Sequence, residues 1–402
     1  GDWKPFADQF LAQAGKPATP LEINNQLGVR LAFLDTQPDG TEIPTSPGRS
    51  EHGFTMAHIA RHLVCSPVDS ERCAAKITTR LALPIVRFDP VSERRTVYDW
   101  KRGGFLGFQS HLADAIVKEV DDWQAVRGLP DAPQRLVLNI SAAWDGDFFG
   151  GLDEAEIAEM RAGTRAVYQA LQYAAENDVL VLAAAGNKRD CAEPSEGPML
   201  PAAWEEGTPP DGICGDPPSE PLVYAVGGVD SMGQPLANSI PGGMPKRAAF
   251  AENAVVGTLE PGRSTRMYTG SSVATAVVSS IAAIVWDTLP GQRPAEVMKI
   301  LDESDTALTL PANFWFRSST SRSATTPQVH MLSLCKALQR ACTPGVPNCP
   351  LPEGAECPEW TPAKSSLKKD WETPAAGSCH PWTGPQPEEN PCPICNPPRI
   401  SN

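Results

Sequence analysis

The sequence predicts an α/β fold in which a mostly parallel central sheet is covered by helices on both faces. Short apolar runs alternate along the chain with segments of helical length and spacing, and this alternation is typical of parallel sheets. Each run is continuously apolar instead of alternately apolar and polar, which indicates strands that are buried on both faces. We therefore expect a domain of three layers, with the sheet in the middle.

The expected elements follow from these runs. The expected strands are residues 29–35, 83–88, 135–141, 179–187, 221–229 and 253–257. The expected helices are residues 52–64, 110–127, 154–177, 272–289, 294–304 and 331–342. Ligands of such sheets bind beyond the carboxyl ends of the strands, so chemistry is expected along that edge.

The composition of the chain changes near residue 343. Residues 343–402 hold 14 of the 41 prolines and five of the 11 cysteines and show no apolar period. This composition predicts an extended tail held by disulfides instead of a second packed core. We therefore divide the chain into an N-terminal arm (1–21), an α/β domain (22–342) and a Pro/Cys-rich tail (343–402).

Charge and cysteine content narrow the partners and the compartment. The chain has 34 basic and 48 acidic residues, a net charge of −14, which disfavours nucleic acid and anionic membranes as partners. No apolar stretch approaches the 18 residues that would indicate a membrane span. Eleven cysteines favour an oxidising compartment, so we expect a secreted or periplasmic protein and not a cytosolic one with buried thiols.

The spacing of the cysteines suggests particular bridges. Cys65 and Cys73 are close enough in the chain to close a small loop after the helix at 52–64. Cys191 and Cys214 flank an insertion rich in proline and glycine, and a bridge between them would brace it.

Two further cysteines lie in the expected helix at 331–342. Cys335 and Cys342 would be separated by about 10 Å along such a helix, beyond disulfide reach, so we expect one of them to bind the tail to the domain. In the tail, the CPIC sequence at 392–395 has the spacing of a zinc knuckle, with only Cys379 and His380 as further ligands. A disulfide role is favoured over zinc there.

An acid and an imidazole mark the first candidate site. Asp35 ends a buried strand, where a carboxylate is poorly solvated and needs a hydrogen-bond donor. The alternative role is that of a turn or helix-capping aspartate. His52 begins a helix and precedes Gly53. A helix N-terminus favours the neutral imidazole, which suits a general base.

Two more histidines lie deeper in the same helix. His58 and His62 are four residues apart on one helical face, a spacing that can bind a metal ion. The sequence lacks the glutamate of the HExxH zinc motif, and a packed or solvated pair is the favoured interpretation.

A hydroxyl and an amide complete the candidate set. Ser272 falls in the first turn of an apolar helix, where a base could activate it and free N–H groups could bind an oxyanion. The alternative is an ordinary capping serine. Asn187 ends an apolar run, and its amide could donate into the same site. The alternative there is a turn asparagine.

The four residues occur in the order Asp, His, Asn, Ser, and the strings around them support a family resemblance. The relevant strings are VRLAFLDTQPD, HGFTMA, VLVLAAAGN and YTGSSVATA. With them, residues 22–342 resemble the subtilisin-like serine peptidases, whose triad has the chain order Asp, His, Ser. The resemblance implies a three-layer subtilisin-like fold and hydrolysis of peptide bonds in proteins.

The resemblance also implies a role for each residue. Ser272 would be the nucleophile, His52 the general base and acid, and Asp35 the residue that orients His52. The side chain of Asn187 would bind the oxyanion. The substrate would lie against two segments, which are Ser141, Ala142 and Ala143 on one side and Ala184, Ala185 and Gly186 on the other.

The family pattern bears on cofactors as well. No cofactor is expected for the chemistry. A structural calcium ion remains open, although we identify no metal site. Only 16 residues separate Asp35 from His52, and that interval is too short for the calcium-binding loop that the family often has there. Many family members fold with an inhibitory propeptide, so a longer precursor is expected.

Two other functions stay open at this stage. A transpeptidase or macrocyclase would use the same acyl-enzyme but pass it to an amine, and would need a lid that excludes water. A non-catalytic binding protein could keep the fold alone. Labelling by a fluorophosphonate would separate the second from an enzyme.

Overall fold

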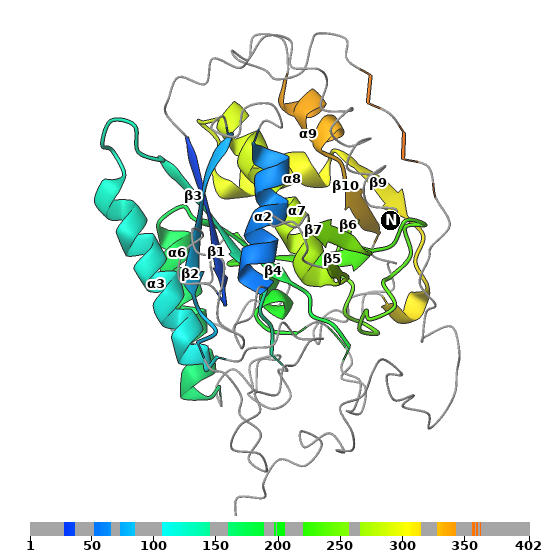
Figure 1. Cartoon of the computed structure of the whole chain (residues 1–402), viewed down its shortest axis with the longest axis horizontal. Helices are drawn as coiled ribbons and strands as arrows, with labels where there is room; N and C mark the ends of the chain where they lie inside the picture. The colour runs from blue at the N-terminus through cyan, green and yellow to red at the C-terminus, as the bar shows by residue number, and fades with distance from the viewer. Residues whose placement is uncertain are drawn as a thin grey trace, which may run out of the picture.

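Eight strands form one sheet in the order β2-β1-β3-β4-β5-β6-β10-β9, and every neighbouring pair is parallel except β10 with β9 (Figure 1). The strands are β1 (Val29–Asp35), β2 (Ala75–Leu81), β3 (Arg135–Ile140), β4 (Leu180–Ala184), β5 (Tyr224–Val229), β6 (Arg247–Phe250), β9 (Asp305–Leu308) and β10 (Val329–Leu332). The predicted mostly parallel sheet is therefore confirmed.

The computed structural model describes thirteen stretches of the chain. They are residues 28–36, 52–65, 73–84, 107–144, 160–188, 197, 199–205, 220–256, 266–314, 328–342, 356–357, 359–360 and 362. The N-terminal arm (1–21), Cys191, Cys214, Cys379, His380 and the CPIC sequence at 392–395 lie outside these residues, and the predictions made for them stay predictions.

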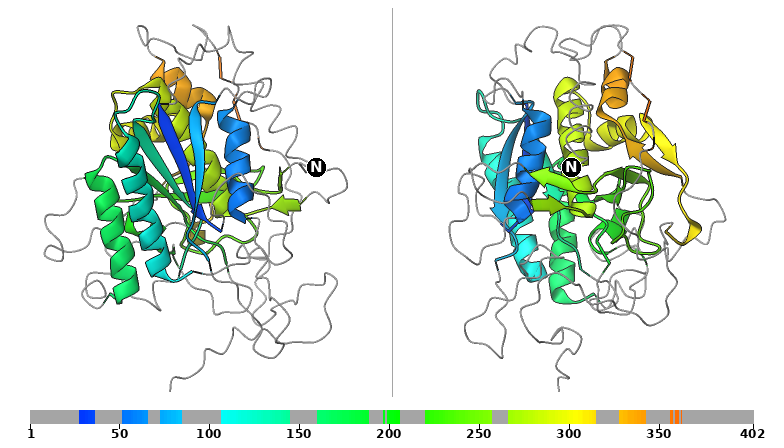
Figure 2. Two further views of the ribbon diagram at one scale, coloured as in Figure 1. Left: turned by 60° about the vertical axis from the view of Figure 1, so that its left-hand side comes forward. Right: turned by 45° about the vertical axis from the view of Figure 1, so that its right-hand side comes forward.

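Helices cover both faces of the sheet (Figure 2). On one face α3 (Gln109–Val126) packs on α6 (Ala162–Glu176), and their apolar sides meet β1, β3 and β4 in one core. On the other face α2 (His52–Val64) packs on α7 (Ser271–Thr288), with α8 (Pro294–Asp302) and α9 (Leu334–Ala341) beside them. The predicted arrangement of three layers is confirmed.

The helix α7 runs through the middle of this second core. It is 18 residues long and apolar enough, by length and composition, to cross a membrane, although 83% of it is buried inside the domain. The prediction that no segment reaches that length and apolarity was therefore wrong. In the described part of the chain this is the one helix that qualifies, and its apolar sides pack on the sheet and on α2.

The strand that follows α2 differs from the predicted one. The sequence suggests residues 83–88, whereas the structure has β2 at Ala75–Leu81. Residues 83 and 84 are irregular, and residues 85–88 are not described. β2 lies at the edge of the sheet, so it need not be buried on both faces, and its polar sequence AKITTRL carries no continuous apolar run.

Three other predicted elements have different bounds or places. The helix expected at 154–177 begins at Ala162, after Arg161, whose backbone is extended. The strand expected at 253–257 is β7 (Ala254–Val256), which pairs with β8 (Arg266–Tyr268) in a separate antiparallel ribbon. The helix expected at 331–342 begins at Leu334, because residues 329–332 form β10 and Ser333 caps the helix.

A buried ion cluster joins three elements of the domain. Arg247 on β6 is 1% exposed and binds Asp302 at the end of α8, with Nη2 and Oδ2 2.6 Å apart, as well as Glu205. Glu205 ends a short 3-10 helix, η2 (Ala202–Glu205), and its Oε2 accepts a hydrogen bond from Ala225 N at 2.9 Å. Because a buried charge is costly without partners, these contacts fix η2 and the segment before it against the sheet.

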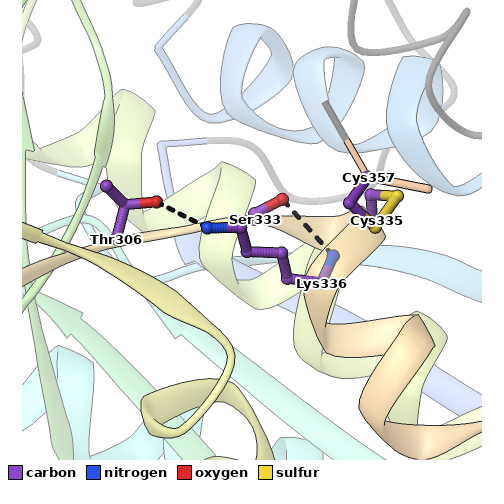
Figure 3. Close-up of a disulfide and its surroundings, with 5 residues drawn as sticks. All are labelled: Thr306, Ser333, Cys335, Lys336 and Cys357. Atoms are coloured by element: carbon purple, nitrogen blue, oxygen red, sulfur yellow. Dashed lines mark hydrogen bonds between the residues drawn. A yellow bond between two sulfur atoms is a disulfide. The ribbon is translucent and has the colours of Figure 1, made fainter. Parts of the chain in front are cut away.

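Two disulfides lie within the described residues. Cys65 and Cys73 close the loop after α2, as predicted. Cys335 on α9 bonds to Cys357, so the prediction that Cys335 or Cys342 binds the tail is confirmed (Figure 3). Close to Cys357, Trp360 packs beside Leu308 and Gly233. The start of the tail is therefore joined to the domain by a covalent bond and an apolar contact.

Candidate functional site

The predicted site residues lie at the carboxyl edge of the sheet. Asp35 is the last residue of β1, and Asn187 follows the end of β4 by three residues. His52 is the first residue of α2, and Ser272 is the second residue of α7. The strand order reverses its direction of growth between β1 and β3, and such a switch point is where open parallel sheets bind ligands.

Asp35 holds the ring of His52 with both carboxylate oxygens. The distances from His52 Nδ1 to Asp35 Oδ1 and Oδ2 are 3.0 and 2.8 Å. Asp35 is 1% exposed, and its Oδ1 also accepts the N–H of Thr36 at 2.7 Å. Since a carboxylate only accepts hydrogen bonds, Nδ1 must carry the hydrogen in the neutral ring. The lone pair of the imidazole is therefore on Nε2.

Glycine at position 53 lets the start of α2 come this close to β1. A Cβ atom there would lie 2.8 Å from Asp35 Cβ and 3.1 Å from Thr36 N. The Gly53 N–H donates to Thr36 Oγ1 at 3.0 Å, which satisfies one free donor of the first turn. The local sequence His-Gly thus docks the helix on the strand and sets the contact between Asp35 and His52.

The pKa of His52 is raised above the ordinary imidazole value of 6.5. Burial alone would lower the pKa, but the charge of Asp35 and its hydrogen bond to the ring favour the cation and together outweigh burial. A raised pKa makes the ring a better proton acceptor. This is the electrostatic arrangement that a general base requires.

Ser272 is fixed to the end of β3 by a reciprocal pair of contacts. Its Oγ lies 3.4 Å from the carbonyl oxygen of Ser141, and Ser141 Oγ lies 3.5 Å from the carbonyl oxygen of Ser272. Both are at the long end of hydrogen-bond distances, so the Ser272 hydroxyl is held only loosely. A nearby base could therefore compete with the Ser141 carbonyl for the hydroxyl hydrogen of Ser272.

Asn139 braces this contact from inside the sheet. Its Oδ1 accepts the hydroxyl of Ser141 at 2.8 Å, and its Nδ2 donates to Ser279 Oγ on α7 at 3.1 Å. All three side chains are buried. The network sets the position of the first turns of α7 relative to β3. The sequence analysis assigned no role to Asn139 or Ser279, because they are 140 residues apart.

The two halves of the site start from adjacent strands. β1 and β3 are parallel neighbours, with Leu34 opposite Ile140, so Asp35 and Ser141 occupy the next position along each strand. Adjacent strands lie about 4.8 Å apart. His52 is bonded to one strand end and Ser272 to the other, and their helices pack against each other. The structure thus brings Asp35 together with His52 and sets Ser272 beside them on the same edge.

Asn187 lies against the residue before Ser272. Its Oδ1 accepts the N–H of Ser271 at 3.0 Å and lies 3.3 Å from Ser271 Oγ. A backbone N–H can only donate, so the side-chain atom that faces it must be the oxygen. The amide nitrogen Nδ2 then points elsewhere and makes no hydrogen bond to any residue that the structure describes. A donor is therefore available one residue from the Ser272 backbone.

The two predicted substrate segments lie on either side of a third one. Ser141, Ala142 and Ala143 follow β3, whereas Ala184 ends β4 and Ala185 and Gly186 follow it. Between them, Met199 N donates to Ala185 O at 3.0 Å, and Leu200 exchanges two backbone hydrogen bonds of 2.9 Å with Trp144. The segment 199–200 therefore joins the two predicted walls.

Met199 is a site residue that the sequence analysis missed. Gly186 has a φ of +97°, and a Cβ there would lie 2.5 Å from Met199 Sδ. The methionine side chain thus fills the space directly over Gly186. No signal in the sequence near residue 199 indicated this, because the contact crosses an insertion whose length does not predict where the chain returns.

The part of the chain that the structure describes contains no group of three or more His, Cys, Asp or Glu side chains suited to a metal ion. The two histidines His58 and His62 do meet, with their Nε2 atoms 3.0 Å apart. Asp35 and His52 form a hydrogen-bonded pair, an arrangement that suits proton transfer.

Comparisons with known proteins identify a family that matches part of the chain. Residues 136–314 match the model of the Subtilase family. No curated protein matches the chain. The match begins at β3, so it contains Ser141, Asn187 and Ser272 and leaves Asp35 and His52 to its N-terminal side.

Among solved structures, three proteases are similar to this chain. The Prenylagaramide maturation protease PagA is 21% identical, covering 84% of this chain and all of its own, with a TM-score of 0.46. The serine protease MycP1, a component of the type VII (ESX-1) secretion system, is 21% identical over 82% of this chain and 87% of its own, with a TM-score of 0.48. A mutant of the protease domain of PatA is 22% identical over 79% and 89%, with a TM-score of 0.42.

Proposed function

Through residues 136–314 this chain belongs to the subtilase family of serine peptidases, and we propose that it is an endopeptidase that cleaves proteins through an acyl-enzyme on Ser272. The observation that carries the proposal is the pair of hydrogen bonds between His52 Nδ1 and Asp35. They leave the basic Nε2 of a ring with a raised pKa as the only proton acceptor of that side chain.

In the first half of the proposed reaction, Ser272 Oγ attacks the carbonyl carbon of the scissile bond and its proton passes to His52 Nε2. Asp35 stabilises the imidazolium that forms. The tetrahedral intermediate then collapses, His52 gives the proton to the leaving amine, and the acyl group remains on Ser272 as an ester. In the second half, water attacks the ester with His52 as base and releases the acid.

The negative oxygen of the intermediate needs donors that are already in place. Asn187 supports this role, because Ser271 fixes its Oδ1 and leaves Nδ2 to donate. The backbone N–H of Ser272 is the second proposed donor, since the N–H groups of a first helical turn have no acceptor in the helix. No cofactor takes part in these steps.

Substrate binding is proposed along the two wall segments. An extended peptide would pair with the backbone of residues 141–143, in the manner of an added strand. The residue before the cut would then enter the space between Ala142 and Ala184. Met199 lies over Gly186 and binds Ala185 at the second wall, which favours small side chains at that position of the substrate.

The compartment that we propose is secreted or periplasmic. Its support is the two disulfides in the described residues, since such bonds persist in oxidising compartments. The net charge of −14 is consistent with protein or peptide substrates and with no nucleic-acid partner.

The proposal is tested by incubating the protein with an unfolded substrate protein and identifying the products by mass spectrometry. New carboxyl termini are expected from the parent chain and from Ser280→Ala, a serine buried on the same helix whose hydroxyl binds Ala276 O. None is expected from Ser272→Ala. Products joined to an added amine instead of water would identify a transpeptidase, and no product from a folded parent would indicate a binding protein.

A further inference from the structure

His58 and His62 form a close pair on α2, away from the proposed catalytic residues. They lie one helical turn apart, with their Nε2 atoms 3.0 Å from each other and their rings perpendicular, 4.5 Å between centroids. Phe54, a turn earlier, stacks on the His58 ring with centroids 5.8 Å apart. Both imidazole tips therefore converge on one point at the surface of the helix.

This separation is a good match to two ligands of one metal ion. Imidazole nitrogens bind such ions at about 2.1 Å, so two Nε2 atoms 3.0 Å apart would subtend about 90° at the metal. A tetrahedral centre would need about 3.4 Å between them. The right angle suits the square or octahedral centres of Cu²⁺ and Ni²⁺, which also prefer imidazole.

The two rings also offer the lone pairs that coordination needs. A neutral imidazole has one nitrogen that carries hydrogen and one with a lone pair. Moving one hydrogen from Nε2 to Nδ1 by tautomerisation puts both lone pairs on the two Nε2 atoms that face each other.

We propose that His58 and His62 bind one divalent transition-metal ion of the Ni²⁺ and Cu²⁺ class, with water in the remaining positions. The site is structural, not catalytic, because Ile59 stands where the helix of a zinc peptidase carries its glutamate.

The consequence of binding follows from the spacing of the two ligands. They converge only while residues 58–62 are helical, so the folded chain binds the ion more tightly than the unfolded chain. Bound metal therefore stabilises α2, the helix that begins with His52. The charge of Arg61 repels the ion, but salt and solvent screen this repulsion at the surface, whereas the two coordination bonds act directly.

The test uses untagged full-length protein with Ser272→Ala, which removes self-cleavage without touching the pair. Ni²⁺ is the probe, because it does not oxidise thiols as Cu²⁺ does. Isothermal titration at pH 7.5 is expected to show a Ni²⁺ site that depends on both histidines. At about 100 times Kd the ion should raise Tm by about 4 °C. Mg²⁺, which prefers oxygen ligands, should leave Tm unchanged.

The variants separate this site from other histidines. His58→Ala and His62→Ala should each weaken Ni²⁺ binding by about 10-fold or more and should abolish the rise in Tm. Loss of a residue that merely hydrogen-bonds to a metal ligand already weakens affinity by that factor. His111→Ala, on α3, should keep both. Unchanged Ni²⁺ affinity in folded His62→Ala, or no binding by the parent at millimolar Ni²⁺, would overturn the proposal. Circular dichroism without metal checks that each variant is folded.

Discussion

The carboxylate of Asp35 contacts His52 Nδ1 with both of its oxygens, at 3.0 and 2.8 Å. The two residues are 17 positions apart and meet because β1 ends where α2 begins, with Gly53 and Thr36 joining the two elements. This contact fixes which ring nitrogen is basic, so it decides what His52 can do for a neighbouring hydroxyl.

Asp35→Asn tests the orienting role of the carboxylate. An asparagine can present its NH₂ group to Nδ1, which would favour the wrong tautomer, so kcat should fall by about 10⁴-fold with little change in KM. Steady-state kinetics on a peptide substrate measures this. The matched control is Asp114→Asn, an exposed aspartate that pairs with Lys118, and it should retain full activity. A loss below tenfold for Asp35→Asn would contradict the role.

The pH profile tests the raised pKa of His52. The neutral ring is the base, so kcat/KM should rise with pH and reach half its maximum above pH 6.5, the ordinary imidazole value. In Asp35→Asn the half-point should move to lower pH, because the charge that raised the pKa is lost. The contact that raises this pKa also stabilises the folded protein below pH 6.5, and this stabilisation is lost as the pH rises through the raised pKa. A half-point below pH 6.5 in the parent would be inconsistent with the contact.

Asn187 can be examined with two substitutions that separate its two possible functions. Asn187→Ala should lower kcat by about 10² to 10³-fold through loss of the oxyanion donor. Asn187→Asp keeps the oxygen that accepts the Ser271 N–H but removes the donor, so it should be at least as inactive while keeping the parent's Tm. If Asn187→Asp were as active as the parent protein, Asn187 would have a structural role and would not be the oxyanion donor.

Met199→Gly should widen the range of accepted substrates. The side chain lies over Gly186, so its removal opens space beside the two walls. We expect kcat/KM for a peptide with phenylalanine before the cut to rise by about 10-fold relative to one with alanine. Met232→Ala is the control, since that methionine is 45% exposed. An unchanged ratio of the two substrates would remove Met199 from the list of specificity residues.

The sequence alone indicated much of the site because its local signals coincide with structural requirements. Asp35 had to end a strand, which is visible as the polar residue that closes an apolar run, and His52 had to begin a helix, which is visible as apolar residues at helical spacing after it. Gly53 is needed because a Cβ atom there would lie 2.8 Å from Asp35 Cβ and 3.1 Å from Thr36 N. Such short-range requirements leave a record in a single sequence.

Other features could not be inferred because they depend on long-range placement. The edge strand β2 is polar, so its burial pattern gave no apolar run. β7 was assigned to the large sheet, although its sequence is equally suited to the ribbon with β8. Asn139 and Met199 act through partners that lie far along the chain or across an insertion. Hydrophobic periodicity holds no information about these pairings.

The most direct test of the whole account is covalent labelling of Ser272. A fluorophosphonate reacts only with a serine whose hydroxyl is activated by a base, so the parent protein should be labelled, with the adduct on the peptide that contains Ser272. Ser280→Ala should be labelled like the parent, whereas His52→Ala and Ser272→Ala should not be labelled. If the folded parent stayed unlabelled, or if the adduct formed equally well without His52, the proposed chemistry would be wrong.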